Sequence, residues 1–185
     1  MNETLTLLRH FIRNPKQVGA IIPSSAALSR EMLAKVDFRN AKTILELGPG
    51  LGIFTRGILK RARKDARIVC FEINWKFCKF LSARFKDKRI QMINSGAEKL
   101  GQELIKLGIK KADCVISGLP FRNFTKWQQE KILCQVSESL TENGKFVLFQ
   151  YTNGLRPMLE KHFSSVDRTF VAMNVPPAFV YVCKK

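Results

Sequence analysis

After residue 40, short β-rich segments alternate with helical segments, and this alternation constrains the fold more than any other feature of the sequence. Runs rich in branched and aromatic residues indicate strands at residues 43–47, 67–72, 89–94, 112–117 and 145–151. Helical stretches separate these strands, at residues 53–64, 75–85, 98–107 and 125–140. Consecutive strand–helix units of this kind predict an α/β fold, in which a parallel sheet carries helices on both faces.

The end of the chain departs from this alternation. A short helix expected near residues 157–163 is followed by strands at 166–173 and 179–183, and only a short segment with two prolines separates the two strands. That segment is too short for a crossover helix, so the two strands must run antiparallel. We therefore expect a mostly parallel, seven-stranded sheet with an antiparallel C-terminal hairpin strand. This Rossmann-like architecture resembles that of class I methyltransferases.

The composition is that of an ordinary globular protein, and it favours a partner with many negative charges. The chain of 185 residues has the length of one domain, which we expect to span residues 1–185. It holds 32 lysine and arginine residues against 15 aspartate and glutamate residues, a net charge of +17. Such an excess attracts nucleic acid or an anionic membrane surface, although it says nothing about the fold.

The cysteine and histidine residues indicate neither a metal site nor a disulfide framework. The five cysteines are scattered without a CxxC pair, and the chain has only two histidines. No apolar run is long enough to span a bilayer, and the first residues lack the apolar core of a secretory signal. We therefore expect a reduced, cytoplasmic protein without a metal.

Many of the basic residues fall where helices end and the next strands begin. They form three groups, at residues Lys60–Arg67, Lys86–Arg89 and Lys110–Lys111. These positions belong to the edge of the sheet opposite the carboxyl ends of the parallel strands. Part of this charge complements helix dipoles and keeps the protein soluble. The rest leaves room for a noncatalytic contact with a polyanion at this far edge.

Residues 1–36 are predicted to form a helical extension that covers the cofactor and acceptor site. An amphipathic helix is expected over residues 3–13, with an apolar side made by Leu5, Leu8, Phe11 and Ile12. Its other side carries Arg9 and Arg13. Ser24 or Ser25 can cap a second helix that ends near Val36. The first helix is either a flap packed on the domain or an interfacial helix on a phospholipid membrane.

A glycine-rich turn follows the first strand of the alternating region. The residues Glu46, Gly48, Gly50 and Gly52 form an ExGxGxG pattern between that strand and the next helix. Glycines there let a ligand approach the backbone, and the helix N-terminus offers unpaired N–H groups. Because residue 53 is isoleucine, the pattern is not the GxGxxG loop of dinucleotide-binding proteins. It is typical of S-adenosylmethionine binding, and Glu46 suits a ligand with a cationic amine and a sulfonium.

The ends of the second and third strands complete the expected cofactor site. Glu72 is placed to accept hydrogen bonds from ribose hydroxyls, with Ile73 beside it. Many methyltransferases hold the adenine amino group with an aspartate near the position of Gly96, and that acid is missing here. Backbone groups of Gly96 and Ala97, or the hydroxyl of Ser95, must then replace it.

The fourth strand ends in a loop that class I methyltransferases use to bind the methyl acceptor. In this loop we expect Ser117 to contact the cofactor, and Pro120 and Phe121 to contact the acceptor. The alternative is a proline-ended strand with a buried phenylalanine. The acceptor amine would be held by the carbonyls of Gly118 and Leu119 and the ring of Tyr151, although Tyr151 also suits the core. No residue is convincingly placed as a general base.

Four segments resemble bacterial phospholipid N-methyltransferases, which methylate phosphatidylethanolamine. They are residues 14–25, 46–52, 117–120 and 174–178. The resemblance implies a peripheral membrane enzyme that uses S-adenosylmethionine. It places Ser24 and Ser25 over the methionine end of the cofactor. It also places Tyr151 and Asn174 in the acceptor pocket, with Arg156 near the lipid phosphate.

The ribosomal RNA adenine dimethylases have a similar core and provide an alternative, with RNA as the partner. In their fourth motif an asparagine grips the adenine amino group, and this chain has Gly118 at that position. Those enzymes also carry an additional C-terminal helical domain. Lipid amine methylation is therefore the main prediction, and RNA adenine methylation is the alternative.

Overall fold

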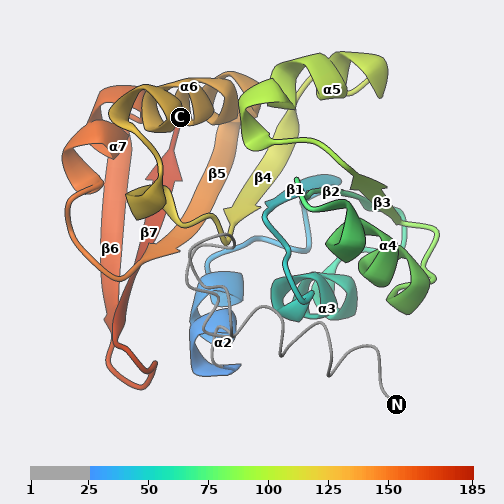
Figure 1. The fold of residues 1–185 in the computed structure, drawn as a ribbon, viewed down its shortest axis with the longest axis horizontal. Helices are drawn as coiled ribbons and strands as arrows, with labels where there is room; N and C mark the ends of the chain where they lie inside the picture. The colour runs from blue at the N-terminus through green and yellow to red at the C-terminus, as the bar shows by residue number, and fades with distance from the viewer. Residues whose placement is uncertain (1–25) are drawn as a thin grey trace.

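Residues 26–185 of the computed structural model are described here, and they contain a seven-stranded sheet with the order β3-β2-β1-β4-β5-β7-β6 (Figure 1). The strands are β1 (Thr43–Leu47), β2 (Arg67–Phe71), β3 (Ile90–Ile93), β4 (Ala112–Ser117), β5 (Leu140–Gln150), β6 (Ser165–Val171) and β7 (Ala178–Lys184). Strands β1 to β5 pair in parallel, whereas β7 runs antiparallel to both of its neighbours, β5 and β6. The expected sheet with its antiparallel C-terminal strand is thus confirmed.

Helices cover both faces of this sheet (Figure 1). One face carries α2 (Ala26–Ala34), α3 (Ile53–Arg61) and α4 (Trp75–Arg84), and the other carries α5 (Leu100–Lys106), α6 (Lys126–Ser139) and α7 (Arg156–His162). Two short 3₁₀ helices, η1 (Ala97–Lys99) and η2 (Phe121–Asn123), follow β3 and β4. This arrangement buries the central strands on both sides, as their unbroken apolar sequences require.

Side chains that alternate along β1 divide between two cores. Leu45 and Leu47 belong to the core beneath α5, α6 and α7, whereas Ile44 belongs to the core beneath α2 and α3. Glu46 points to the same side as Ile44, because residues two apart in a strand share a face. A carboxyl group therefore lies inside the protein, immediately before the glycine-rich turn.

The structure differs from the expected elements mainly at their ends. The helix over residues 98–107 is divided into η1 and α5, and α3 ends at Arg61, where Ala62 takes an extended conformation. Strand β5 begins at Leu140, five residues earlier than expected, because Leu140 pairs with Ala112 ahead of a register shift in the β4–β5 ladder. The expected helix over residues 3–13 lies outside the described residues, as do Leu5, Leu8, Arg9, Phe11, Ile12, Arg13, Ser24 and Ser25.

Several basic residues of the far edge hold helix ends and loops in place. The guanidinium of Arg89 donates hydrogen bonds to the carbonyls of Leu59, Ala62 and Arg63 at 2.9–3.1 Å, where α3 ends. It also forms an ion pair with Asp87 at 2.7 Å. A cation among the last carbonyls of a helix complements the helix dipole. Part of the basic far edge is therefore structural, as expected.

We expect Arg89→Ala to lower the free energy of unfolding by about 2 kcal/mol, because three carbonyls at the end of α3 lose their donor. Lys88→Ala is the matched control, since this neighbouring lysine is exposed. Urea denaturation of both variants measures the difference. Equal stability of the two variants would contradict this role of Arg89.

Candidate cofactor and acceptor site

The glycine-rich turn lies at the carboxyl edge of the sheet, between β1 and α3. Gly48, Gly50 and Gly52 have φ angles of 70°, 54° and 79°, a region that side chains disfavour. A Cβ atom on Gly48 would lie 2.8 Å from Cδ2 of Leu119, and one on Gly52 would lie 2.6 Å from Cε2 of Phe85. The turn therefore requires glycine for its conformation and for its close neighbours, and it leads into α3, whose N-terminus has no side-chain cap.

Glu72, at the end of β2, fastens this turn to the neighbouring strand. Its Oε2 accepts a hydrogen bond from the backbone N–H of Gly50 at 3.2 Å, and its Oε1 accepts one from Asn74 at 2.9 Å. Burial raises the pKa of Glu72, and hydrogen bonds from the backbone N–H groups of Asn74, Gly50 and Ile73 oppose that rise. A carboxylate has about four acceptor sites, so one is left for a further donor such as a ribose hydroxyl of a bound cofactor.

Asn94 holds the backbone on the other side of Glu72, and the sequence analysis missed it. Its Nδ2 donates to the carbonyls of Glu72 and Ile73 at 2.8 and 2.9 Å. The side chain of Ile73 is left 74% exposed. The expected contact of Ile73 with the cofactor stays a prediction. An asparagine at a strand end was the available signal, but its partners could not be read from sequence.

Glu46 lies beneath the glycine-rich turn and has no exposed surface. Its Oε2 accepts hydrogen bonds from the hydroxyl of Thr55 at 2.8 Å and from the thiol of Cys70 at 3.3 Å. No residue within 26–185 donates to its Oε1. Burial raises the pKa of Glu46 to about 7. The carboxyl group thus lies between β1 and α3 rather than on the outer surface of the turn, and its contact with a cofactor stays a prediction.

The raised pKa of Glu46 predicts a pH dependence of stability. Folded protein keeps a proton that the unfolded chain, with a pKa near 4.5, releases, so the contribution of Glu46 is complete below about pH 4.5 and is lost as the pH rises through about 7. We expect Glu46→Gln to remove this dependence and to be more stable than the parent by about 3 kcal/mol at high pH. Denaturation curves between pH 5 and 8 test this, and parallel pH profiles of the two proteins would contradict it.

The space beside Gly96, where many methyltransferases have an acid, is occupied by a carboxylate from another residue. A Cβ atom built on Gly96 would overlap the carboxylate of Glu98, which therefore occupies the space of a side chain at position 96. Ala97, next to it, is buried. From the sequence, Glu98 is expected only as the first residue of a helix, because no local pattern indicates that its side chain folds back over Gly96. A carboxylate at this place can accept a hydrogen bond from an adenine amino group.

Glu98→Ala is expected to lower the affinity for S-adenosylhomocysteine by about tenfold, since a charge-assisted hydrogen bond to the amino group is lost. Affinity for the deaminated analogue S-inosylhomocysteine, which lacks that amino group, should change little. Titration calorimetry measures both, with the exposed neighbour in Lys99→Ala as the control. Equal losses for the two ligands would show that Glu98 acts on the local fold instead.

In the acceptor loop, the carbonyl of Leu119 already accepts hydrogen bonds from within the protein. It accepts hydrogen bonds from the backbone N–H of Phe121 at 3.0 Å and from Nε2 of Gln150 at 3.2 Å. The hydroxyl of Ser117 accepts from the N–H of Leu119 at 3.1 Å and is fully buried. With both lone pairs used, the Leu119 carbonyl holds the loop in shape. An acceptor amine would have to compete with these two donors, and the expected contacts of the Leu119 and Gly118 carbonyls with that amine stay predictions.

The side chain of Phe121 also needs a correction. It is fully buried in the core beneath α5, α6 and α7, and its ring lies edge-on to that of Phe124 with centroids 5.9 Å apart. It supports the loop from below and does not face an acceptor. The alternative of a buried phenylalanine after the strand is therefore the one that the structure supports. Pro120 remains half-buried above it.

Tyr151 and Asn174 come together although they are far apart in the chain. Burial raises the pKa of Tyr151, and a side-chain hydrogen bond with Asn174 opposes that rise. Asn174 is only 2% exposed, and the ring of Tyr151 packs edge-on against Phe149 with centroids 5.5 Å apart. Tyr151 is thus a half-buried aromatic at the end of β5. Arg156, at the start of α7, forms a 2.8 Å ion pair with Glu160.

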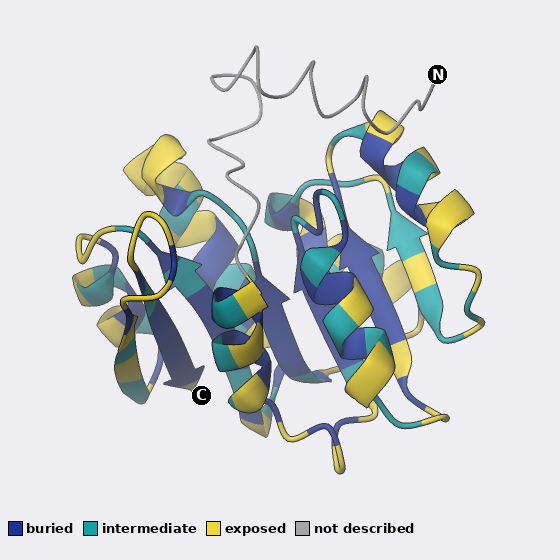
Figure 2. Ribbon diagram, turned by 90° about the horizontal axis from the view of Figure 1, so that it is seen from below, coloured by how far each residue is buried: buried dark blue, intermediate teal, exposed yellow. Residues whose placement is uncertain are grey.

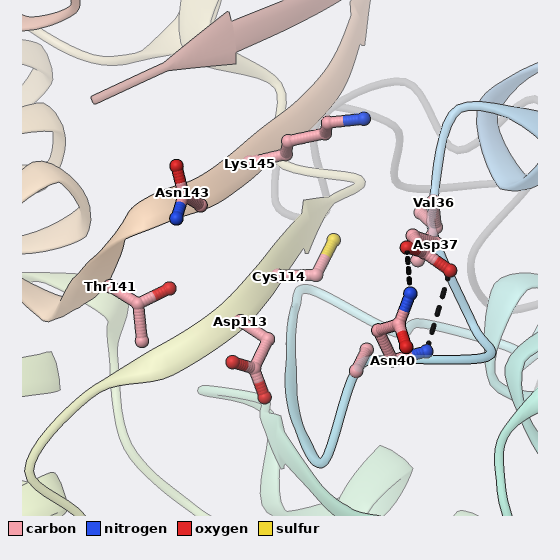
Figure 3. Close-up of a pocket in the computed structure, with 9 residues that line it drawn as sticks. Val36, Asp37, Asn40, Asp113, Cys114, Thr141, Asn143 and Lys145 are labelled. Atoms are coloured by element: carbon pink, nitrogen blue, oxygen red, sulfur yellow. Dashed lines mark hydrogen bonds between the residues drawn. The ribbon is translucent and has the colours of Figure 1, made fainter.

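A separate cavity of about 200 Å³ lies at the opposite edge of the sheet (Figure 3). Asp37 and Asp113 line it, together with Lys145 on β5. Asp37 accepts hydrogen bonds from Asn40, and Asp113 accepts from the backbone of residues 42 and 43 at 2.8 and 2.9 Å. These carboxylates shape the loop before β1. Among the described residues there is no group of three metal-ligating side chains.

The turn with three left-handed glycines, the acid closing β2 and the sheet with its antiparallel β7 define a class I methyltransferase that uses S-adenosylmethionine. Residues 7–138 match the family model described as ribosomal RNA adenine dimethylase. The chain belongs to that family.

Individual relatives include both lipid and RNA methyltransferases. The chain is 29% identical over 186 residues to an ornithine lipid N-methyltransferase from Singulisphaera acidiphila, a match that covers 100% of this chain and 97% of the relative. It is 28% identical over 138 residues to ribosomal RNA small subunit methyltransferase A from Dehalococcoides mccartyi, covering 69% of this chain and 46% of that one. The chain thus spans about half the length of this RNA-modifying relative.

A solved structure supports the fold. The 1,6-didemethyltoxoflavin-N1-methyltransferase of Burkholderia thailandensis, which contains S-adenosylhomocysteine, superposes with a TM-score of 0.70. The superposition covers 99% of this chain and 89% of the other at 16% sequence identity. The predicted cofactor class and the relationship to adenine dimethylases are confirmed.

Proposed function

We propose that this methyltransferase methylates the amine of a membrane phospholipid of the phosphatidylethanolamine type. The observation that carries the proposal is the Tyr151–Asn174 pair at the carboxyl edge. Both residues lie outside residues 7–138, the part that matches the adenine dimethylase family. The match to the ornithine lipid N-methyltransferase, in contrast, covers the whole chain. The segment beyond the family-model match thus lies within the match to an enzyme named for a lipid amine.

The acceptor loop gives a second reason to prefer a lipid amine. A Cβ atom on Gly118 would lie 2.9 Å from the carbonyl oxygen of Gly48, so the backbone leaves no room for a side chain there. The adenine dimethylases that this loop resembles use an asparagine at that position to grip the adenine amino group. This chain has no asparagine side chain at position 118 to bind the adenine amino group, and this argues against adenine as the acceptor.

The proposed mechanism relies on positioning. S-adenosylmethionine supplies an activated methyl group, so the protein mainly has to align the acceptor for an in-line displacement. The Gly118 carbonyl and the ring of Tyr151 would orient a neutral amine, and Arg156 would hold the lipid phosphate. Glu72, Ile73 and Glu98 would fix the adenosine end of the cofactor.

Peripheral attachment to the membrane belongs to the same proposal. The residues expected to contact lipid, Leu5, Leu8, Phe11, Ile12, Arg9 and Arg13, lie outside the described part of the structure. Within residues 26–185, no helix combines the length and the apolar character needed to cross a membrane.

The proposal predicts methyl transfer from labelled S-adenosylmethionine to phosphatidylethanolamine vesicles. Parallel reactions contain ornithine lipid vesicles or ribosomal RNA, the acceptors named for the relatives. Label in ornithine lipid alone would move the assignment to that lipid amine. Label in RNA adenine alone would overturn the lipid proposal.

Tyr151→Ala should lower kcat about 100-fold, because the acceptor loses an orienting surface. Its affinity for S-adenosylhomocysteine should stay close to that of the parent. Tyr151→Phe is the matched control, since it keeps the ring and removes only the hydroxyl that meets Asn174. A Tyr151→Ala protein with normal turnover would contradict the acceptor role.

A further inference from the structure

Large apolar side chains that stay exposed gather at one edge of the described structure. Six of the seven such residues lie at or beside the carboxyl edge, and only Ile105, at the end of α5, lies at the opposite edge. Ile73 belongs to the cofactor site. The other five, which we call the apolar rim, are Trp75, Trp127, Phe170, Met173 and Val175. Single exposed apolar residues are common on protein surfaces, but a concentration at the edge that holds the site is informative.

The turn between β6 and β7 forms one end of the apolar rim. Met173 and Val175 are each 81% exposed, whereas Asn174 between them is buried. The side chain of Asn174 donates to the carbonyl of Pro176 at 2.6 Å and contacts Tyr151. The turn is thus anchored from inside, and residues 172–177 carry no charge. Figure 2 shows this turn as a largely exposed loop.

Both tryptophans of the chain lie in the rim, and cations accompany the apolar residues. Trp75 begins α4 beside the exposed Lys76, and Trp127 lies in the first turn of α6 beside the exposed Lys126. The ammonium of Lys131 lies 5.1 Å from the ring centre of Trp127. Tryptophan next to lysine is the combination that favours the boundary between lipid tails and headgroups.

We propose that the apolar rim is a lipid-docking surface that rests on a bilayer containing anionic phospholipid. The exposed lysines beside the rim, Lys76, Lys126 and Lys131, give this edge the positive charge that complements such a surface. This inference rests on the proposed lipid acceptor, because a phospholipid keeps its acyl chains in the bilayer while its headgroup reaches Tyr151. The rim lies on the same edge as Tyr151, so the acceptor can enter without leaving the membrane.

Sedimentation with vesicles of phosphatidylcholine and phosphatidylglycerol tests the docking surface without any proposed substrate. The double variant Met173→Asp/Val175→Asp should partition about tenfold less into the vesicle fraction. The matched control is Ile105→Asp, which charges an equally exposed apolar residue (79%) at the opposite edge and should bind like the parent. Melting curves and S-adenosylhomocysteine affinity of both variants should match the parent.

The two tryptophans report directly which edge meets the lipid. Trp75→Phe and Trp127→Phe each leave one fluorescent indole, whose emission should shift to the blue on vesicles and be quenched by brominated acyl chains. Quenching of both indoles supports the docking surface. Vesicle-bound protein with two unquenched indoles would overturn it, because another surface would then hold the membrane.

The outcomes separate this inference from the proposed function. Quenched indoles without methylation of any lipid amine would keep the docking surface and reject the phosphatidylethanolamine acceptor. Methylation of phosphatidylethanolamine in detergent micelles, together with normal vesicle binding by the Met173→Asp/Val175→Asp variant, would keep the acceptor and reject the docking surface. An absence of vesicle binding by the parent would also reject it, whether or not the protein binds RNA or another protein.

Discussion

The carboxyl edge depends on a close contact between two backbone segments, the turn after β1 and the loop after β4. Gly48 and Gly118 meet there, and neither position has space for a Cβ atom. The N–H of Gly118 donates to the carbonyl of Leu47 at 2.9 Å, so the contact is also hydrogen-bonded. Cofactor turn and acceptor loop are therefore fixed to each other. A side chain at either glycine would push the two segments apart and change the spacing between them.

Short sequence patterns correctly predicted the strands and turns that depend mainly on neighbouring residues in the chain. The limits of β1 and β4 follow from apolar runs that end in glycine or a polar residue, and both strands agree with expectation. The glycine-rich turn and Glu72 were recognised because strand, turn and acid occur in a fixed order. The split between η1 and α5, by contrast, depends on tertiary packing that periodicity does not report.

The errors at the site share one physical origin, which is competition for hydrogen bonds and space. The hydrogen bonds that the Leu119 carbonyl accepts from Phe121 and Gln150 were not foreseen, because these donors are assigned only by the fold. Phe121 was expected at the acceptor because it lies in the acceptor loop. Whether its ring faces the core depends on the conformation of that loop, which the sequence does not reveal. Glu98 was missed because its carboxylate fills a space that Gly96, two residues earlier, leaves open, and the sequence does not show this contact.

Strand order has a consequence for how the protein is made. Strand β6 pairs only with β7 within the described sheet, and β7 also separates it from β5. During synthesis both edges of β6 therefore stay unpaired until β7 has left the ribosome. The strands that precede the glycine-rich turn and Glu72 can pair much earlier. Asn174 lies between these two late strands. A nascent chain that ends before β7 therefore contains the glycine-rich turn and Glu72, whereas Tyr151 still lacks Asn174 in its folded position.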